Sequence, residues 1–263
     1  MLPIIFKPKH EFDLLRLGGD FDGGYLVEKN SIEKSQSLIT LGLGYEWRFE
    51  KEYKKKFNKP IHCYDHTVNY SAIKKYSRKS FLSTLVRTLK PKYFLKKGFF
   101  SSHISSIFLY KDYKNLFKND VLHFTKRVGP GFGPGSEGIT LKDILKNGIE
   151  DPHYLKVDIE TSEYRILDEI LDNQDKFTGI AIEFHDVDLH LEKIISFIES
   201  LKMSLVHIHP MNQALVVNNI PTQIELTFSK NPKKINDEPM LPHPLDMPGN
   251  PAFKEIELKF EKN

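Results

Sequence analysis

The sequence contains little cysteine, no long apolar run and almost no net charge. Its single cysteine, Cys63, excludes an intrachain disulfide framework and a zinc site built from cysteines. No apolar run has the length of a membrane span, and the apolar residues at the N-terminus are too few for a secretory signal. The net charge of +3, from 38 Lys and Arg against 35 Asp and Glu, is too small to indicate nucleic acid by itself. We therefore expect a globular protein of the reducing cytoplasm with no integral membrane segment.

Short apolar runs alternate with helical patterns through most of the chain. Strands are predicted at 38–41, 61–64, 154–157, 179–184, 205–208 and 224–228, and helices at about 49–57, 140–146, 162–171 and 191–201. This alternation predicts βαβ units and therefore an α/β fold with a mainly parallel sheet. No helix separates the last two strands, so we expect them to form an antiparallel hairpin at one edge of the sheet.

One domain over residues 1–263 is expected, because the sequence shows no internal repeat and no clean linker. Residues 71–127 are predicted to be a partly helical insertion rich in Lys and Arg. Its basic face is either simply solvated or a docking surface for an anionic substrate or a membrane. The proline-rich residues 239–263 are predicted to lie as an extended C-terminal strap.

A glycine turn and an acidic residue together predict a nucleoside site. Gly42 and Gly44 follow the first strand, where a ligand can approach the backbone at the start of the next helix. Asp65 comes about 20 residues later, at the end of the next strand, where it could accept hydrogen bonds from both ribose hydroxyls. These features do not separate S-adenosylmethionine (SAM) from NAD.

The start of the helix after this turn favours SAM. A dinucleotide site generally has a third glycine that lets the pyrophosphate lie against the helix, but Trp47 holds that position. Glu46 and Glu50 place negative charge in the first turn, where it would repel a pyrophosphate. A ligand with an amino group and no phosphate, such as SAM, fits better.

The segment from Leu155 to Tyr164, LKVDIETSEY, resembles the signature strand and turn of FkbM-type SAM-dependent methyltransferases, usually Lys-x-Asp-x-Glu-Gly-x-Glu. The similarity continues at 182–185, 207–212, 220–228 and 244–248, and 22–25 resembles a segment found ahead of the SAM loop in a subgroup of that family. It covers most of the chain except the basic insertion. Thr161 departs from the pattern, because it stands where the family usually has glycine, and the change is expected to alter the turn.

The resemblance implies a Rossmann-like class I methyltransferase fold with SAM as the cofactor. Gly42 and Gly44 would face the methionine part of SAM, Asp65 the ribose, and the loop at Ser136 would close over the adenine. Glu46 and Asp158 complete the predicted cofactor-binding residues. Many relatives methylate hydroxyls on polyketides or sugars, including bacterial surface glycans.

An aliphatic hydroxyl needs a base or a divalent ion to become a good nucleophile, because it otherwise keeps its proton. His185 is the preferred base, since it should project from a strand end and titrate near neutrality; a purely structural histidine is the alternative. Asp158 and Glu160 are the next catalytic candidates. His207 and His209 could bind a divalent metal together with Asp158 and His185, but no ligand spacing is diagnostic, so we do not favour a metal.

The predicted substrate-binding residues are Asp22, Tyr25, His207, His209 and Asn212, with Tyr25 stacking on a ring and Asp22 binding a hydroxyl. The predicted function is SAM-dependent O-methylation of a sugar hydroxyl, free or nucleotide-linked, in surface polysaccharide or other glycan biosynthesis. An NAD-dependent oxidoreductase and a non-catalytic scaffold in glycan assembly remain the alternatives. Nucleic acid is not expected as a partner, because the basic helix lacks interleaved aromatic residues for base stacking. The sugar, the hydroxyl and the oligomeric state stay open.

Overall fold

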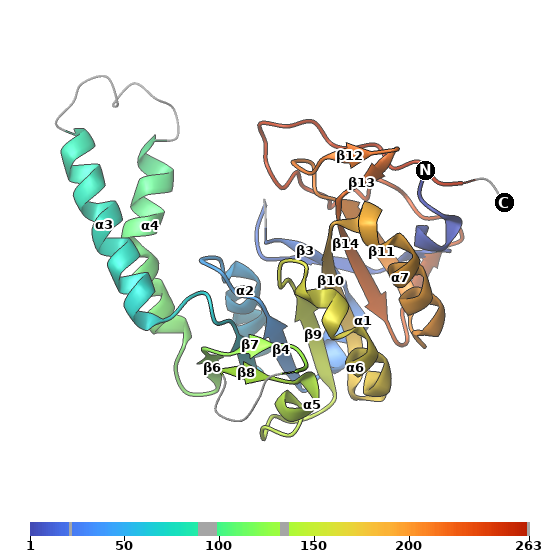
Figure 1. Ribbon diagram of the computed structural model, residues 1–263, viewed down its shortest axis with the longest axis horizontal. Coiled ribbons are helices and arrows are strands. Elements are labelled where there is room, and N and C mark those ends of the chain that lie inside the picture. Colours follow the sequence, from blue (N-terminus) through green and yellow to red (C-terminus); the bar gives the residue numbers. More distant parts are fainter. Residues whose placement is uncertain (21–22, 89–98, 132–136, 262–263) are drawn as a thin grey trace.

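The computed structural model describes residues 1–20, 23–88, 99–131 and 137–261. Its centre is a sheet of seven strands in the order β11-β14-β10-β9-β4-β5-β6 (Figure 1). The strands are β4 (Ser37–Leu41), β5 (Ile61–Tyr64), β6 (Val121–Phe124), β9 (His153–Val157), β10 (Phe177–His185), β11 (Ser204–Pro210) and β14 (Gln223–Ser229). The pairs from β10 to β6 are parallel, whereas β14 runs antiparallel to both β10 and β11. The predicted α/β class and the antiparallel pair at the sheet edge are confirmed.

The two faces of the sheet differ in chemistry. One face is apolar, with Ile182, Phe184 and Leu226 among its buried residues, and it packs in one cluster with residues of α5 (Leu141–Ile144), α6 (Leu167–Asp172) and α7 (Val187–Ser200). The other face lies under α1 (Lys29–Lys34), α2 (Arg48–Phe57) and the antiparallel hairpin β2 (Leu14–Leu17) and β3 (Tyr25–Glu28). Because side chains alternate along a strand, the polar residues of β9, β10, β14 and β11 gather on this second face. The hairpin therefore covers a buried row of charged side chains.

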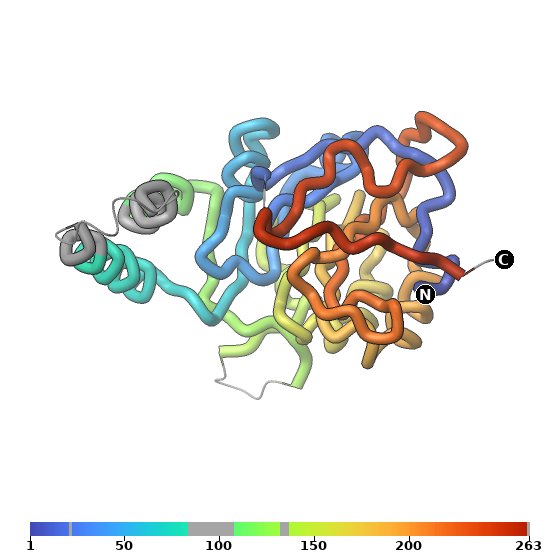
Figure 2. The backbone as a smooth tube through the Cα atoms, turned by 90° about the horizontal axis from the view of Figure 1, so that it is seen from above, coloured from blue at the N-terminus to red at the C-terminus, as the bar shows by residue number. Residues whose placement is uncertain are grey.

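Two long helices form a hairpin that reaches away from the sheet, α3 (Tyr70–Thr88) and α4 (Phe99–Leu116) (Figures 1 and 2). Apart from Tyr70, these helices lie within residues 71–127, where we predicted a partly helical insertion. The structure differs at the C-terminal end of that range, because β6 is the edge strand of the central sheet and not part of a helical insertion. A strand of four residues with a mixed pattern was too short for the sequence to indicate.

The remaining elements are short. They are η1 (Ile4–Phe6), η3 (Ser162–Arg165), η4 (Gln174–Lys176), β1 (Glu11–Phe12), β7 (Arg127–Val128), β8 (Gly138–Ile139), β12 (Val216–Val217), β13 (Ile220–Pro221) and β15 (Lys234–Asn236). The C-terminal segment crosses the body and ends near the N-terminus (Figure 2), where the Leu2 N–H donates to the Lys259 carbonyl at 2.8 Å. Among the described residues, none of the helices combines the length and the apolar character needed to cross a bilayer.

Candidate active site

A cavity of about 480 Å³ opens where β4, β5 and β9 end. This is the position at which open α/β sheets bind ligands, outside the carboxyl ends of the strands. The predicted cofactor-binding residues Gly42, Gly44, Glu46, Asp65 and Asp158 all line it. Ser136, the remaining one, lies outside the described residues.

The two glycines of the turn serve different purposes. Gly42 has φ +86°, and a Cβ there would overlap the backbone carbonyl of Asp158, so glycine is needed for the close approach of two strand ends. Gly44 has φ +55°, and no atom lies within 4 Å of the position of its missing Cβ. Only Gly44 therefore leaves room for a ligand beside the backbone.

Asp65 holds the glycine turn in place. Its Oδ2 accepts from the N–H groups of Leu43 (2.8 Å) and Gly44 (2.7 Å), and its Oδ1 accepts from the N–H and hydroxyl of Thr67, each at 2.6 Å. Burial alone would raise the pKa of Asp65, but the bonds from Thr67, Gly44 and Leu43 outweigh it and lower the pKa. The carboxylate already accepts four hydrogen bonds, which is close to its capacity. Ribose hydroxyls would have to replace some of these donors.

Charges of both signs line the inner wall of the cavity. Glu50 is fully buried and accepts from the Thr40 hydroxyl at 2.9 Å, while its second oxygen has no partner among the described residues. Burial raises the pKa of Glu50, and the nearby Lys156 opposes this. Burial would lower the pKa of Lys156, but Asp158, Glu50 and Glu183 outweigh it and raise the pKa. Lys156 Nζ lies 3.9 Å from Asp158 Oδ2 and 4.8 Å from the centre of the Tyr25 ring.

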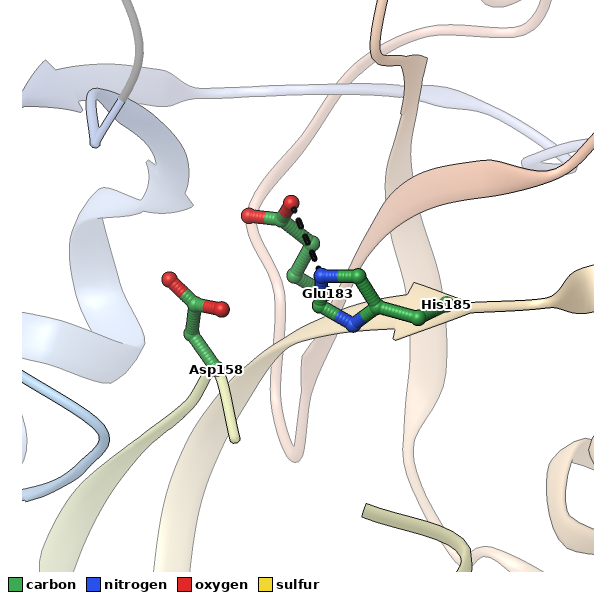
Figure 3. A group of neighbouring side chains, drawn as sticks. All are labelled: Asp158, Glu183 and His185. Atoms are coloured by element: carbon green, nitrogen blue, oxygen red, sulfur yellow. Dashed lines mark ion pairs between the residues drawn. The ribbon is translucent and has the colours of Figure 1, made fainter. Parts of the chain in front are cut away.

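Beside this wall, Asp158, Glu183 and His185 bring their polar atoms within 4.8 Å of one another (Figure 3). The Tyr25 hydroxyl donates to Glu183 Oε2 at 2.8 Å and lies 3.3 Å from Asp158 Oδ2. Gln223 Nε2 donates to the other oxygen of Glu183. Burial raises the pKa of Glu183 to about 8, with Asp158 and Glu225 adding to the effect. The cluster therefore combines a buried carboxyl group of raised pKa with a histidine and a second carboxyl group.

His185 is held from both sides. Glu163 Oε1 accepts from its backbone N–H at 2.8 Å and lies 3.1 Å from Nδ1, while Nε2 lies 3.6 Å from Glu183 and 3.4 Å from Glu160. Burial would lower the pKa of His185, but the Glu163 bond and the charges of Glu183, Glu163 and Asp158 outweigh it and raise the pKa to about 9. The pKa of His185 therefore lies above the neutral range that we expected, because four carboxyl groups lie near the ring.

Glu163, Glu183 and Gln223 are site residues that the sequence analysis missed. Glu163 is the last residue of the Lys-x-Asp-x-Glu-Gly-x-Glu pattern, and that was the signal that could have found it. Glu183 stands between two buried apolar residues of β10, where a carboxylate is unusual. Glu160 projects outward with its side chain 85% exposed, so it contacts the ring from the solvent side.

The predicted substrate-binding residues do not gather at one place. Tyr25 reaches the cluster, but its ring is fully buried against Phe49 and Lys156, so it is not open for stacking on a sugar. Asp22 lies outside the described residues. His207, His209 and Asn212 do not line the cavity but form a second group that holds the C-terminal segment.

In this second group the side chains contact other residues of the protein, although both ring nitrogens of His207 and Nε2 of His209 have no hydrogen-bond partner among the described residues. Asn212 Nδ2 donates to the carbonyls of Asn250 (2.9 Å) and Phe253 (3.1 Å), and its Oδ1 accepts from the Asn250 N–H at 2.9 Å. His207 Nε2 lies 2.9 Å from Asp246 Oδ1, and His209 lies 3.7 Å from Glu225 and 3.4 Å from Glu255. These contacts fasten residues 246–255 to β11 and β14, and that the three side chains bind substrate stays a prediction.

Thr161 adopts a backbone conformation that favours glycine. Its φ is +67°, in the left-handed region, where a β-branched side chain is strained. We expect Thr161→Gly to raise the free energy of unfolding by about 1 kcal/mol, since relief of strain exceeds the added entropy of glycine in the unfolded chain. Urea unfolding of both proteins checks this. A lower stability of the variant would mean that contacts of the threonine side chain outweigh the strain.

Comparison with known proteins gives a family match over part of the chain and distant similarity to solved structures. Residues 123–204 match the family described as the methyltransferase FkbM domain. No curated protein sequence matches the chain. Among solved structures, the fibrillarin/Nop5p complex is similar at 8% identity and a TM-score of 0.37, with 74% of this chain and 73% of that chain covered. A precorrin-6y C5,15-methyltransferase from Geobacter metallireducens is similar at 11% identity and a TM-score of 0.36, with 76% and 84% covered.

The parallel sheet, the antiparallel β14 between β10 and β11 and the glycine turn after β4 define a Rossmann-like class I methyltransferase fold. Within that class, the match over β6 to the start of β11 confirms the resemblance to the FkbM methyltransferases. The matched segment contains Asp158, Glu163, Glu183 and His185. All three residues of the cluster therefore lie in the segment that matches the family.

Proposed function

We propose that the protein is a SAM-dependent O-methyltransferase that acts on a sugar hydroxyl in glycan biosynthesis. The observation that carries the proposal is the position of Asp158, which both lines the cavity behind the glycine turn and belongs to the cluster with Glu183 and His185. One residue thus joins a nucleoside-sized cavity to a group of proton-transfer side chains. An NAD-dependent oxidoreductase has less support, because Glu46 and Glu50 follow the glycine turn, which is where a dinucleotide places its pyrophosphate.

Three features of the cavity are compatible with SAM as its ligand. Gly44 leaves open space beside the backbone, and Lys156 supplies a buried cation on the same wall as Glu50. One buried oxygen of Glu50 has no partner in the part of the chain that the structure describes. The carboxylates suit an ammonium group, and the lysine suits a carboxylate. When bound, SAM supplies an electrophilic methyl group on its sulfonium sulfur. The cavity volume lies in the range of ordinary ligand sites.

The protein's own part in the reaction is to orient the acceptor hydroxyl and to receive its proton. His185 Nε2 faces the cluster, while Glu163 fixes the other side of the ring and stabilises the imidazolium that forms. Tyr25 and Gln223 hold Glu183 beside it. A divalent metal is not needed for this scheme, although Asp158, Glu183 and His185 lie close enough to hold one.

A sugar acceptor is supported by the charge of the cavity rim. Lys126 and Arg127 line the cavity together with Arg48, so a nucleotide-linked or otherwise phosphorylated sugar would meet cations there. Methyl transfer from labelled SAM to a panel of sugar nucleotides, oligosaccharides and small non-sugar alcohols tests the substrate class. Methylation of the alcohols but of no sugar compound would refute the sugar assignment.

Binding of the cofactor is tested separately by isothermal titration with SAM, S-adenosylhomocysteine and NAD. We expect binding of the first two only, and at least about tenfold weaker binding in Asp65→Asn, because the carboxylate that holds the glycine turn is lost. Asp237→Asn is the matched control, since Asp237 is exposed and does not line the cavity. Binding of NAD instead of SAM would favour the oxidoreductase alternative.

A further inference from the structure

The hairpin of α3 and α4 concentrates positive charge on a part of the molecule that stands away from the sheet (Figure 1). Between Asp65 and Asp112 the sequence contains no acidic residue, while Lys and Arg recur from Lys74 to Lys97 and return at Lys111. Asp112, where this stretch ends, forms an ion pair with Lys51 of α2 and accepts a hydrogen bond from the indole N–H of Trp47, the residue before α2. The carboxylate that ends this stretch therefore contacts the body of the protein rather than the cations of the hairpin.

The described part of the hairpin also exposes large apolar side chains. Phe81 is 51% exposed and Leu82 60% exposed, both on α3. They line an open hollow of about 470 Å³ together with Tyr110 of α4 and three cations, Lys74, Arg78 and Lys111. Exposed Phe and Leu beside Lys and Arg offer both the apolar and the cationic contacts that a membrane interface can accept.

We propose that the α3–α4 hairpin docks on an anionic lipid surface. The cations would bind the headgroups, and Phe81 and Leu82 would enter the interface. Nucleic acid would pair with the cations but would leave Leu82 without a function, and a second copy of this chain would bring like charges together. α3 begins at Tyr70, shortly after Thr67 of the cavity, so docking would bring the candidate active site close to the bilayer. The proposal does not depend on the identity of the acceptor.

Sedimentation of the full chain with lipid vesicles tests the proposal. We expect binding to vesicles of phosphatidylcholine with added phosphatidylglycerol, little binding to phosphatidylcholine alone, and weaker binding as the salt concentration rises. Lys74→Glu with Arg78→Glu is expected to lower the partition coefficient about tenfold or more. Phe81→Ser with Leu82→Ser is expected to lower the partition coefficient as well. The dependence of binding on salt concentration should stay the same in this variant.

The matched control is Lys146→Glu with Lys202→Glu, which makes the same change of charge at exposed lysines outside the hairpin. It should bind vesicles like the unchanged protein, and circular dichroism should show that all three variants are folded. Equal binding to both kinds of vesicle, or an equal loss in the control, would overturn the proposal. Tighter binding to RNA or DNA than to anionic vesicles, or self-association that hides the hairpin, would overturn it too.

Discussion

Gly42→Ala is expected to lower the free energy of unfolding by more than about 4 kcal/mol, which is enough to prevent stable folding of many domains. The new Cβ would overlap the Asp158 carbonyl, and the residue would keep a φ of +86° that alanine rarely adopts. Neither strand end can move away easily. The Gly42 N–H donates to the Tyr64 carbonyl at 2.9 Å, and the Asp158 N–H donates to the Leu41 carbonyl at 2.8 Å.

Gly44→Ala is the matched comparison, because it makes the same chemical change two residues later. Its Cβ would meet no atom within 4 Å, so the cost should be only the left-handed backbone, about 1 kcal/mol. Urea unfolding of the two variants measures the difference, and titration with SAM should show weaker binding to the folded Gly44→Ala protein. Similar stabilities of the two variants would show that the close approach of Gly42 to the Asp158 carbonyl does not require glycine.

The fold could be predicted to a large extent because its signals are local. The apolar runs at 38–41, 154–157 and 179–184 correspond to β4, β9 and β10, and the absence of a helix between 208 and 224 indicated the antiparallel pair. The hairpin of β2 and β3 was not predicted. It depends on packing against β14, whose residues lie about 200 positions away, as the bond from Thr227 to the Leu26 carbonyl illustrates.

The candidate site was predictable only where residues follow strand ends. Asp65, Asp158 and His185 were found in this way, since parallel strands deliver their ends to one edge of the sheet. The residues that contact these three side chains were not predicted, because tertiary packing determines which residues meet. Tyr25 meets Asp158 and Glu183 across more than a hundred residues of sequence. His207 and His209 also belong to a strand near the sheet edge, but the C-terminal segment covers them.

His185→Gln is expected to lower kcat by about 10²- to 10⁴-fold, the usual contribution of a positioned base. With a pKa raised to about 9, His185 carries a proton at neutral pH and cannot accept another until that proton leaves. In the unchanged protein, kcat should therefore rise between pH 7 and about 9, and the variant should lose this rise. Activity is measured with the acceptor identified by the panel, and His10→Gln serves as a control far along the chain from the cluster.

Glu163→Gln distinguishes a base from a histidine that only holds the fold. The glutamine can still accept a hydrogen bond from Nδ1, but the negative charge that favours the imidazolium is gone. The pKa of His185 should fall, and the rise of kcat should move to lower pH by the same amount. A structural histidine would give a loss of stability in urea with no displacement of the pH profile. An unchanged profile in Glu163→Gln, with SAM binding intact, would assign proton transfer to another group of the cluster, and Asp158→Asn and Glu183→Gln would then identify it.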